Sequence, residues 1–190
     1  MIIGLTGRNA AGKGTVAAWL QARGFGYLSL SDAIRAYIRA QGHEPTRDRL
    51  IAAGRAMRAA GGAGVLAEQT LAQIPPGTDF IVDSVRNPAE VEVLRRVPGF
   101  VLVEVHAAEQ TRYQRLSERA RAGDASTFDE FRRQEGAELH SGDLSAQQLL
   151  ATAALADEVV RNDDGVEVLE GELTALLARL QREAGTTKAP

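Results

Sequence analysis

The sequence predicts an α/β fold built on one largely parallel sheet, and three observations support this prediction. Five apolar runs of strand length are separated by segments with helical periodicity, the alternation typical of strands and their crossover helices. The first run leads into a turn of small residues and then into an alanine-rich helix. The chain has 190 residues, of which 44% are hydrophobic and 25% charged, so it can bury a sizeable core.

Apolar runs bounded by turn-forming residues define the expected strands. They are Ile2 to Thr6, Tyr27 to Leu30, Phe80 to Val85, Phe100 to His106 and Glu158 to Arg161. Helical patterns occupy the intervals at about 31 to 41, 47 to 59, 63 to 74, 88 to 96, 109 to 121, 128 to 139, 145 to 155 and 165 to 182.

Residues 1 to 184 are expected to form one domain, followed by a flexible tail at 185 to 190. Two stretches, 31 to 75 and 121 to 145, are longer than a simple crossover requires, and both contain glycines. Such stretches suit segments that close over a ligand. The alternative is plain helical decoration of the sheet.

Composition argues against several classes of function. The formal net charge of −3 gives no support for a general nucleic-acid or membrane-surface binder. The chain has no cysteine, which excludes disulfides, thiolate metal sites and cysteine nucleophiles. No apolar run approaches the ~18 residues that span a bilayer, and the first residues lack a secretory pattern, so we expect a cytoplasmic protein.

The turn after the first strand fits the phosphate-binding pattern G-x-x-x-x-G-K. It comprises Gly7, Arg8, Asn9, Ala10, Ala11, Gly12 and Lys13. Small side chains let the backbone N–H groups and the positive helix end surround a polyphosphate. Lys13, one of two lysines in the chain, would neutralise the outer phosphates. The alternative is a tight turn with an incidental lysine.

A second candidate site follows the strand that ends near residue 83. Asp83 at the carboxyl end of a parallel strand can orient Mg²⁺ and its waters. Arg86 lies three residues further on, and its planar guanidinium suits bidentate phosphate binding. A helix start with a solvated arginine is the alternative.

The order of motifs resembles P-loop nucleoside monophosphate kinases such as adenylate kinase. Lys13 is followed by Gly14 and Thr15, and this G-K-G-T is similar to the loop of that family. "LSLSDAIR", "DSVRNPAEVE" and "RLSER" follow in the family's order, and "ADEVVRND" is similar to the closing strand of dephospho-coenzyme A kinases. The resemblance implies a P-loop NTPase fold with three α/β/α layers, a sheet ordered 2-3-1-4-5 and a short lid at 121 to 145.

On the acceptor side, the resemblance implies that Arg35 and Arg86 bind the acceptor monophosphate and that Asp32 organises the intervening turn. "SDAIR" is also an ordinary helix start with Ser31 as its cap. Glu90 aligns with a residue that reads the acceptor base, and a structural glutamate near a helix start is the alternative.

On the donor side, the resemblance implies that Arg115 and Arg119, four residues apart on one helix, contact the donor base and the transferred phosphate. The backbone around Asn162 and Asp163 would border the donor adenine, and a plain strand-to-helix turn explains those residues equally well. Two further residues, Arg112 and Arg121, are expected on a solvated face. Additional lid charges would come from Arg132 and Arg133.

These motifs favour ATP-dependent phosphoryl transfer to a nucleoside or deoxynucleoside monophosphate, with ATP and Mg²⁺ as cofactors. The expected catalytic residues are Lys13, Arg119 and Asp83, and Mg²⁺ is expected near Asp83 and Thr15 through water. Dephospho-coenzyme A kinase and a non-catalytic nucleotide-sensing module are the alternatives. The partners are then small-molecule nucleotides, with no nucleic acid or membrane, and the protein is a monomer or homodimer.

Overall fold

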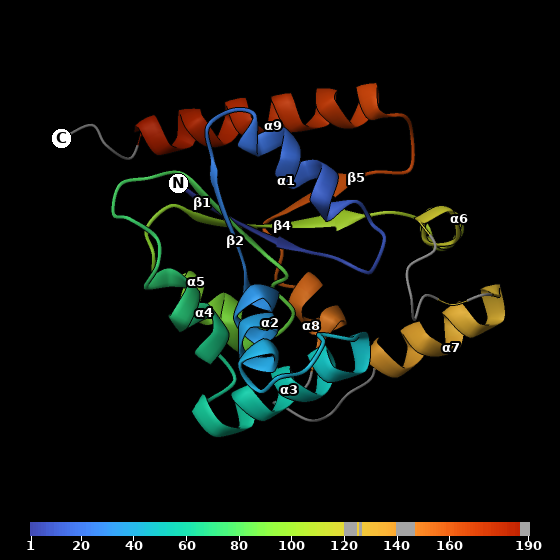
Figure 1. The fold of residues 1–190 in the computed structure, drawn as a ribbon. Coiled ribbons are helices and arrows are strands. Elements are labelled where there is room, and N and C mark those ends of the chain that lie inside the picture. Colours follow the sequence, from blue (N-terminus) through green and yellow to red (C-terminus); the bar gives the residue numbers. More distant parts are fainter. Residues whose placement is uncertain (120–124, 126, 140–146, 187–190) are drawn as a thin grey trace.

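A five-stranded parallel sheet forms the centre of the molecule (Figure 1). The computed structural model describes residues 1–119, 125, 127–139 and 147–186. The strands are β1 (Ile2–Thr6), β2 (Gly26–Ser29), β3 (Phe80–Asp83), β4 (Phe100–His106) and β5 (Glu158–Arg161), and all pairs are parallel. Their order, β2-β3-β1-β4-β5, confirms the predicted fold.

The central strand β1 is buried along its whole length and pairs with a strand on each side. Ile3 lies opposite Ile81 of β3 and Val101 of β4. Because parallel strands point the same way, their carboxyl ends meet at one edge of the sheet. The glycine loop after β1 and the turn after β3 therefore emerge side by side.

Helices cover both faces of the sheet (Figure 1). One face carries α1 (Lys13–Gln21) and α9 (Val166–Thr186). The other carries α2 (Leu30–Ala40), α3 (Arg47–Gly61), α4 (Val65–Leu71), α5 (Pro88–Leu94) and α8 (Leu149–Ala153). Two helices, α6 (Glu109–Arg119) and α7 (Phe128–Leu139), follow β4 along the chain.

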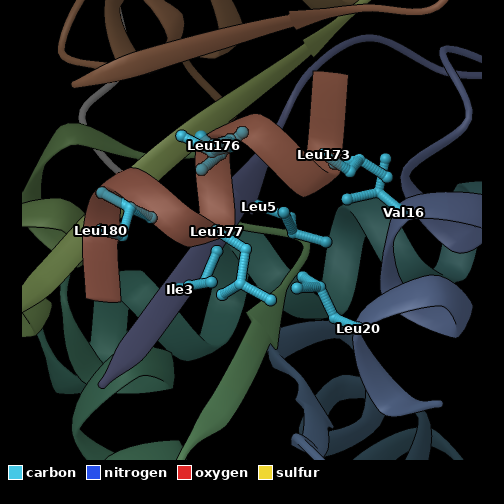
Figure 2. A pocket seen from close by; sticks show the side chains of 9 residues that line it. Ile3, Leu5, Val16, Leu20, Leu173, Leu176, Leu177 and Leu180 are labelled. Atoms are coloured by element: carbon cyan, nitrogen blue, oxygen red, sulfur yellow. The ribbon is translucent and has the colours of Figure 1, made fainter. Parts of the chain in front are cut away.

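The two faces have separate apolar cores. In the first, leucines of α9 point toward Ile3 and Leu5 of β1 and toward α1 (Figure 2). The gap between these side chains is ≈ 10 Å³, which is room for about one water molecule. This apolar gap is therefore a feature of core packing and not a ligand pocket.

Two predicted strand boundaries were wrong. The second strand starts and ends one residue earlier than predicted, because Ser29 caps α2 by accepting a hydrogen bond from the Ser31 N–H at 3.3 Å. The helix cap is thus Ser29 and not Ser31. The third strand ends at Asp83 and not at Val85, because Ser84 takes a left-handed conformation with φ 65°.

The predicted lid and tail lie partly outside the described residues. Of the stretch 121–145, the structure describes residue 125 and residues 127–139, which include α7. At the carboxyl end, α9 continues to Thr186, beyond the predicted end of the helix at 182. Among the described helices, none is both long and apolar enough to cross a membrane.

Candidate functional site

The glycine loop requires glycine at both ends. Gly7 has φ 133°, and a Cβ atom there would lie 2.3 Å from the carbonyl oxygen of Val105. Gly12 has φ 100°, and a Cβ atom there would lie 2.0 Å from Nδ2 of Asn162. Any larger side chain at either position would displace a strand or the β5–α9 turn.

Lys13 lies across the loop. Its Nζ atom donates hydrogen bonds to the carbonyl oxygens of Gly7, at 2.7 Å, and Arg8, at 3.1 Å. Desolvation, followed by the positive charge of Arg86, lowers the pKa of Lys13 to about 8, and the charge of Asp83 opposes this shift. The ammonium group is thus surrounded by positive charge that an anionic ligand would neutralise.

A pocket of ≈ 340 Å³ opens beside this loop, at the carboxyl edge of the sheet. It brings the predicted donor side together with part of the acceptor side. The lining residues are Asn9, Ala10, Gly12, Lys13, Gly14, Thr15, Asp83, Ser84, Arg86, Arg115 and Arg119. Four of these side chains are cationic and one is a carboxylate, a composition that suits a polyphosphate and its counter-ion.

Asp83 is held in place by two neighbours. Its Oδ1 atom accepts a hydrogen bond from the Ser84 N–H at 2.6 Å, and Oδ2 accepts one from the Tyr27 hydroxyl at 3.1 Å. Burial, and next the charge of Asp83, raise the pKa of Tyr27 to about 12, so the tyrosine remains a donor. The carboxylate is therefore fixed at the pocket wall.

On the donor side, Asn162 joins three parts of the chain. Its N–H donates to His106 of β4, its Nδ2 donates to the carbonyl of Ala11 at 2.9 Å, and its Oδ1 accepts from Nη2 of Arg115 at 3.3 Å. Asn162 is buried and does not line the pocket, whereas Arg115 does. The neighbouring Asp163 accepts from the Ala108 N–H at 2.5 Å, just before α6 begins.

Both predicted lid-pair arginines reach the pocket. Within the described part of the chain, Nη1 of Arg115 is buried and has no hydrogen-bond partner. It lies 3.8 Å from the position that a Cβ atom of Gly12 would occupy. Arg119 donates to Oδ1 of Asn9 at 3.3 Å. A phosphate oxygen near Gly12 would supply the partner that Nη1 of Arg115 lacks.

On the acceptor side, only part of the predicted set lines the pocket. Arg86 does, and it donates to Oε1 of Gln147 at 2.9 Å. Arg35 and Asp32 pair with each other at 3.0 Å and are not pocket-lining residues. A chain of hydroxyl contacts nevertheless links Arg35 to Ser84 in the pocket wall, through Ser31 and Ser29.

Glu90 is fully buried, at 0% exposure. Its carboxylate accepts hydrogen bonds from Arg58 and from the backbone N–H groups of Arg86 and Asn87. It therefore presents no surface to a base, and the structure favours the structural alternative for this residue. Arg58 was missed by sequence reasoning. The available signal was a glycine four residues before it, Gly54. The structure places both residues on the buried side of α3.

The prediction that Arg112 is solvated was wrong, because its side chain is buried. It donates to the Ala107 carbonyl at 3.0 Å and forms a bidentate ion pair with Glu135 of α7. Arg8 of the glycine loop contacts the same carboxylate at 3.2 Å. Glu135, which sequence reasoning also missed, thus joins α7 to α6 and to the loop.

The predicted additional lid charges do not line the pocket. Arg132 is exposed and pairs with Glu109 at 3.1 Å, Arg133 is exposed, and Arg121 lies outside the described residues. Across the described ranges, no group of three or more His, Cys, Asp or Glu side chains could hold a metal ion. A metal at this site would need ligands from a bound molecule or water.

Comparison with known proteins identifies relatives of the whole chain. A family model described as an AAA domain matches residues 3–136, which is more than half of the chain. A UPF0200 protein of Hyperthermus butylicus is 34% identical over 182 residues, and the match covers 95% of each chain. The chain belongs to the AAA-domain and UPF0200 families.

Solved structures agree with the fold of this UPF0200 member. TT1252 from Thermus thermophilus is 25% identical, with a TM-score of 0.60 and coverage of 95% of this chain and 97% of that chain. Shikimate kinase from Bacteroides thetaiotaomicron has the same fold, with a TM-score of 0.61, 16% identity and coverage of 95% and 98%. The UPF0200 chain therefore has a P-loop kinase-like fold.

Proposed function

We propose that the protein transfers the γ-phosphoryl group of ATP to a nucleoside or deoxynucleoside monophosphate. The observation that carries this proposal is the composition of the pocket beside the glycine loop. Lys13, Arg86, Arg115 and Arg119 line it together with the carboxylate of Asp83. Two anionic substrates brought together in one pocket require such a surplus of positive charge.

The positions of these side chains divide the pocket into two parts. Lys13 and Arg115 lie at the glycine loop, where the donor phosphates would bind in place of the loop carbonyls that Lys13 now contacts. Arg86 follows β3, where it would bind the acceptor phosphate. Arg119 would stabilise the charge on the phosphoryl group as it moves between them.

Mg²⁺ fits this pocket when it is bound with ATP. Thr15 and Asp83 both line the pocket, and Asp83 is held by Tyr27 and Ser84. A hydroxyl group and a carboxylate are oxygen ligands of the kind that Mg²⁺ and its waters prefer. The ion would supply charge neutralisation on the donor phosphates.

A second candidate is transfer to a hydroxyl acceptor, as in a dephospho-coenzyme A kinase. It is favoured by Asp83, because a carboxylate in the pocket wall can accept the proton of an attacking hydroxyl group. A monophosphate acceptor needs no such base. In the first candidate Asp83 would act only through Mg²⁺ and its waters, whereas in the second it would also accept this proton.

The experiment is an acceptor screen with labelled ATP and Mg²⁺. The panel holds the eight common ribo- and deoxyribonucleoside monophosphates and dephospho-coenzyme A. We expect acceptor-dependent ADP release with at least one monophosphate. ATP binding without acceptor-dependent turnover would instead support a nucleotide-sensing module, and turnover of dephospho-coenzyme A alone would support the second candidate.

Lys13→Ala is expected to lower turnover by more than about 100-fold, because Lys13 is the one lysine among the described residues that line the pocket. Arg132→Ala provides the matched control, since Arg132 is exposed and lies outside the pocket. Circular dichroism and thermal melting should show both variants folded. Full activity of the Lys13 variant would contradict the proposed donor site.

A further inference from the structure

We propose that the buried ion pair between Arg58 of α3 and Glu90 of α5 positions Arg86 for binding of the acceptor phosphate. This inference rests on the proposed function and adds two positioning residues to it. Arg58 and Glu90 are 4% and 0% exposed, and neither lines the pocket. They would therefore act on the acceptor only through Arg86.

The carboxylate of Glu90 divides its hydrogen bonds between two parts of the chain. Oε1 accepts from Nε of Arg58 at 2.9 Å and from its Nη2 at 2.7 Å. Oε2 accepts from the backbone N–H of Arg86 at 2.8 Å and from that of Asn87 at 3.1 Å. One oxygen thus binds α3, and the other fixes the backbone at Arg86.

The backbone of Arg86 is held from both sides. Its N–H donates to Glu90, and its carbonyl oxygen accepts from the N–H of Gln148 at 2.8 Å. Asn87 forms the helix cap of α5: its side chain accepts from the Ala89 N–H at 3.0 Å, and it also forms a reciprocal capping box with Glu90. With its main chain fixed in this way, the Arg86 side chain leaves the backbone at a defined point in the pocket wall.

A capping box alone does not explain the arginine. The glutamate of a capping box needs only to reach the helix start, and it functions there without a counter-charge. Glu90 is completely buried, and burial raises the pKa of Glu90 against the opposing effects of Arg58 and the two backbone N–H groups. Arg58 supplies the counter-charge, and each oxygen of Glu90 accepts two hydrogen bonds, as a carboxylate can.

The surroundings of Arg58 are shaped to hold it. A Cβ atom at Gly54, one helical turn earlier on α3, would lie 3.3 Å from Nη1 of Arg58 and 3.0 Å from Cδ1 of Ile34. Glycine at that position leaves space for the guanidinium between α3 and α2. The position of α3 is thereby linked to the main chain at Arg86.

The test uses steady-state kinetics of Arg58→Lys, Arg58→Met and Glu90→Gln in the full chain. With the best monophosphate of the panel, we expect the acceptor KM to rise on the order of tenfold in Arg58→Met and Glu90→Gln, and less in Arg58→Lys. The KM for ATP should stay within about twofold, because the donor residues are untouched. Arg58→Lys retains the charge and should rescue part of the acceptor KM.

Leu94→Ala is the matched control. Leu94 is fully buried on the same helix as Glu90, so its loss destabilises α5 by creating a cavity. It should lower the melting temperature without raising the acceptor KM. An equal KM increase in Leu94→Ala, or equal increases of the ATP and acceptor KM values in the Arg58 variants, would overturn the positioning role.

Amide hydrogen exchange separates this inference from the proposed function. We expect exchange at Arg86 and Asn87 to be faster in Arg58→Met and Glu90→Gln than in Leu94→Ala. If no acceptor of the panel is phosphorylated, the proposed function fails, and faster exchange would still support the positioning of Arg86. Unchanged exchange at both amides would overturn the inference whatever the kinetics show.

Discussion

Among the described residues, two buried glutamates pair with arginine, Glu90 and Glu135, and they differ in the charge around them. Glu90 pairs with Arg58 alone and gives its other oxygen to backbone N–H groups. Glu135 pairs with Arg112 and also with Arg8 of the glycine loop. The Arg58–Glu90 pair has no net charge. The Glu135 group contains two arginines and one carboxylate, so it leaves one surplus positive charge beside the glycine loop.

The difference shows that one ion pair holds the main chain in place and that the other adds charge beside the candidate donor site. The Arg58–Glu90 pair fixes main-chain positions and has no exposed atom of Glu90. The Glu135 group joins α7, α6 and the loop, and its Arg8 side chain is 37% exposed. A surplus cation near the donor site raises the local potential for an incoming polyphosphate.

The largest expected effect breaks the balanced pair. Glu90→Ala leaves the buried Arg58 without its carboxylate, so we expect the free energy of unfolding to fall by about 3–5 kcal/mol. Arg112→Met should cost less, roughly 2 kcal/mol, because Glu135 keeps its contact with Arg8. Urea unfolding of the two variants measures both values, and a larger loss in Arg112→Met would contradict the comparison.

A second effect concerns the ammonium group of Lys13, which also lies at the glycine loop, and the pH dependence of ATP binding measures it. With the pKa of Lys13 at about 8, the ammonium group that binds phosphate is present below pH 8 and is lost above it. We expect the Kd for ATP to be constant near pH 6–7 and to rise above pH 8 by up to about tenfold per unit. ATP binding above pH 8 should therefore take up a proton, which calorimetry in buffers of different ionisation enthalpy detects.

Folding stability has the opposite pH dependence. Because the pKa of Lys13 is lower in the folded protein than its ordinary value of 10.5, the unfolded chain binds more protons between pH 8 and 10.5. The contribution of Lys13 to the free energy of unfolding should therefore rise with pH across that window. Lys13→Met removes both pH dependences and serves as the control. If the Kd for ATP still rose above pH 8 in Lys13→Met, the pH dependence would belong to another group.

The smallest expected effect comes from Arg8, the exposed arginine that pairs with Glu135. Arg8→Ala should lower the free energy of unfolding by less than about 1 kcal/mol, because an ion pair with a solvent-accessible partner contributes little. ATP affinity should fall more at low salt than at high salt, since exposed charges are screened. A thermal melt measures the change in stability, and ATP titrations at two ionic strengths measure the change in affinity.

Much of the fold and of the donor site could be predicted from sequence. The glycine loop is local, so the spacing of Gly7, Gly12 and Lys13 defines it within seven residues. The strands are short apolar runs, and their order followed from the resemblance to kinases. Their boundaries at Ser29 and Asp83 were missed by one or two residues, because a cap and a left-handed residue decide them.

The buried charges could not be predicted from sequence in the same way. Arg58 and Glu90 are 32 residues apart, and Arg112 and Glu135 are 23 apart, so their pairing depends on how helices pack. An arginine that alternates with polar residues on a helix usually indicates a solvated face. Arg112 fits that pattern and is nevertheless buried, because the carboxylate that neutralises it comes from another helix.

The side chain of Asn162 has a consequence for how the protein is made. It binds the carbonyl of Ala11 across 151 residues of chain. During synthesis the ribosome produces the glycine loop well before β5, so the loop acquires this contact only after the residues between them have been made. A nascent chain halted before β5 would carry the complete phosphate-binding motif and still lack the side chain that secures it.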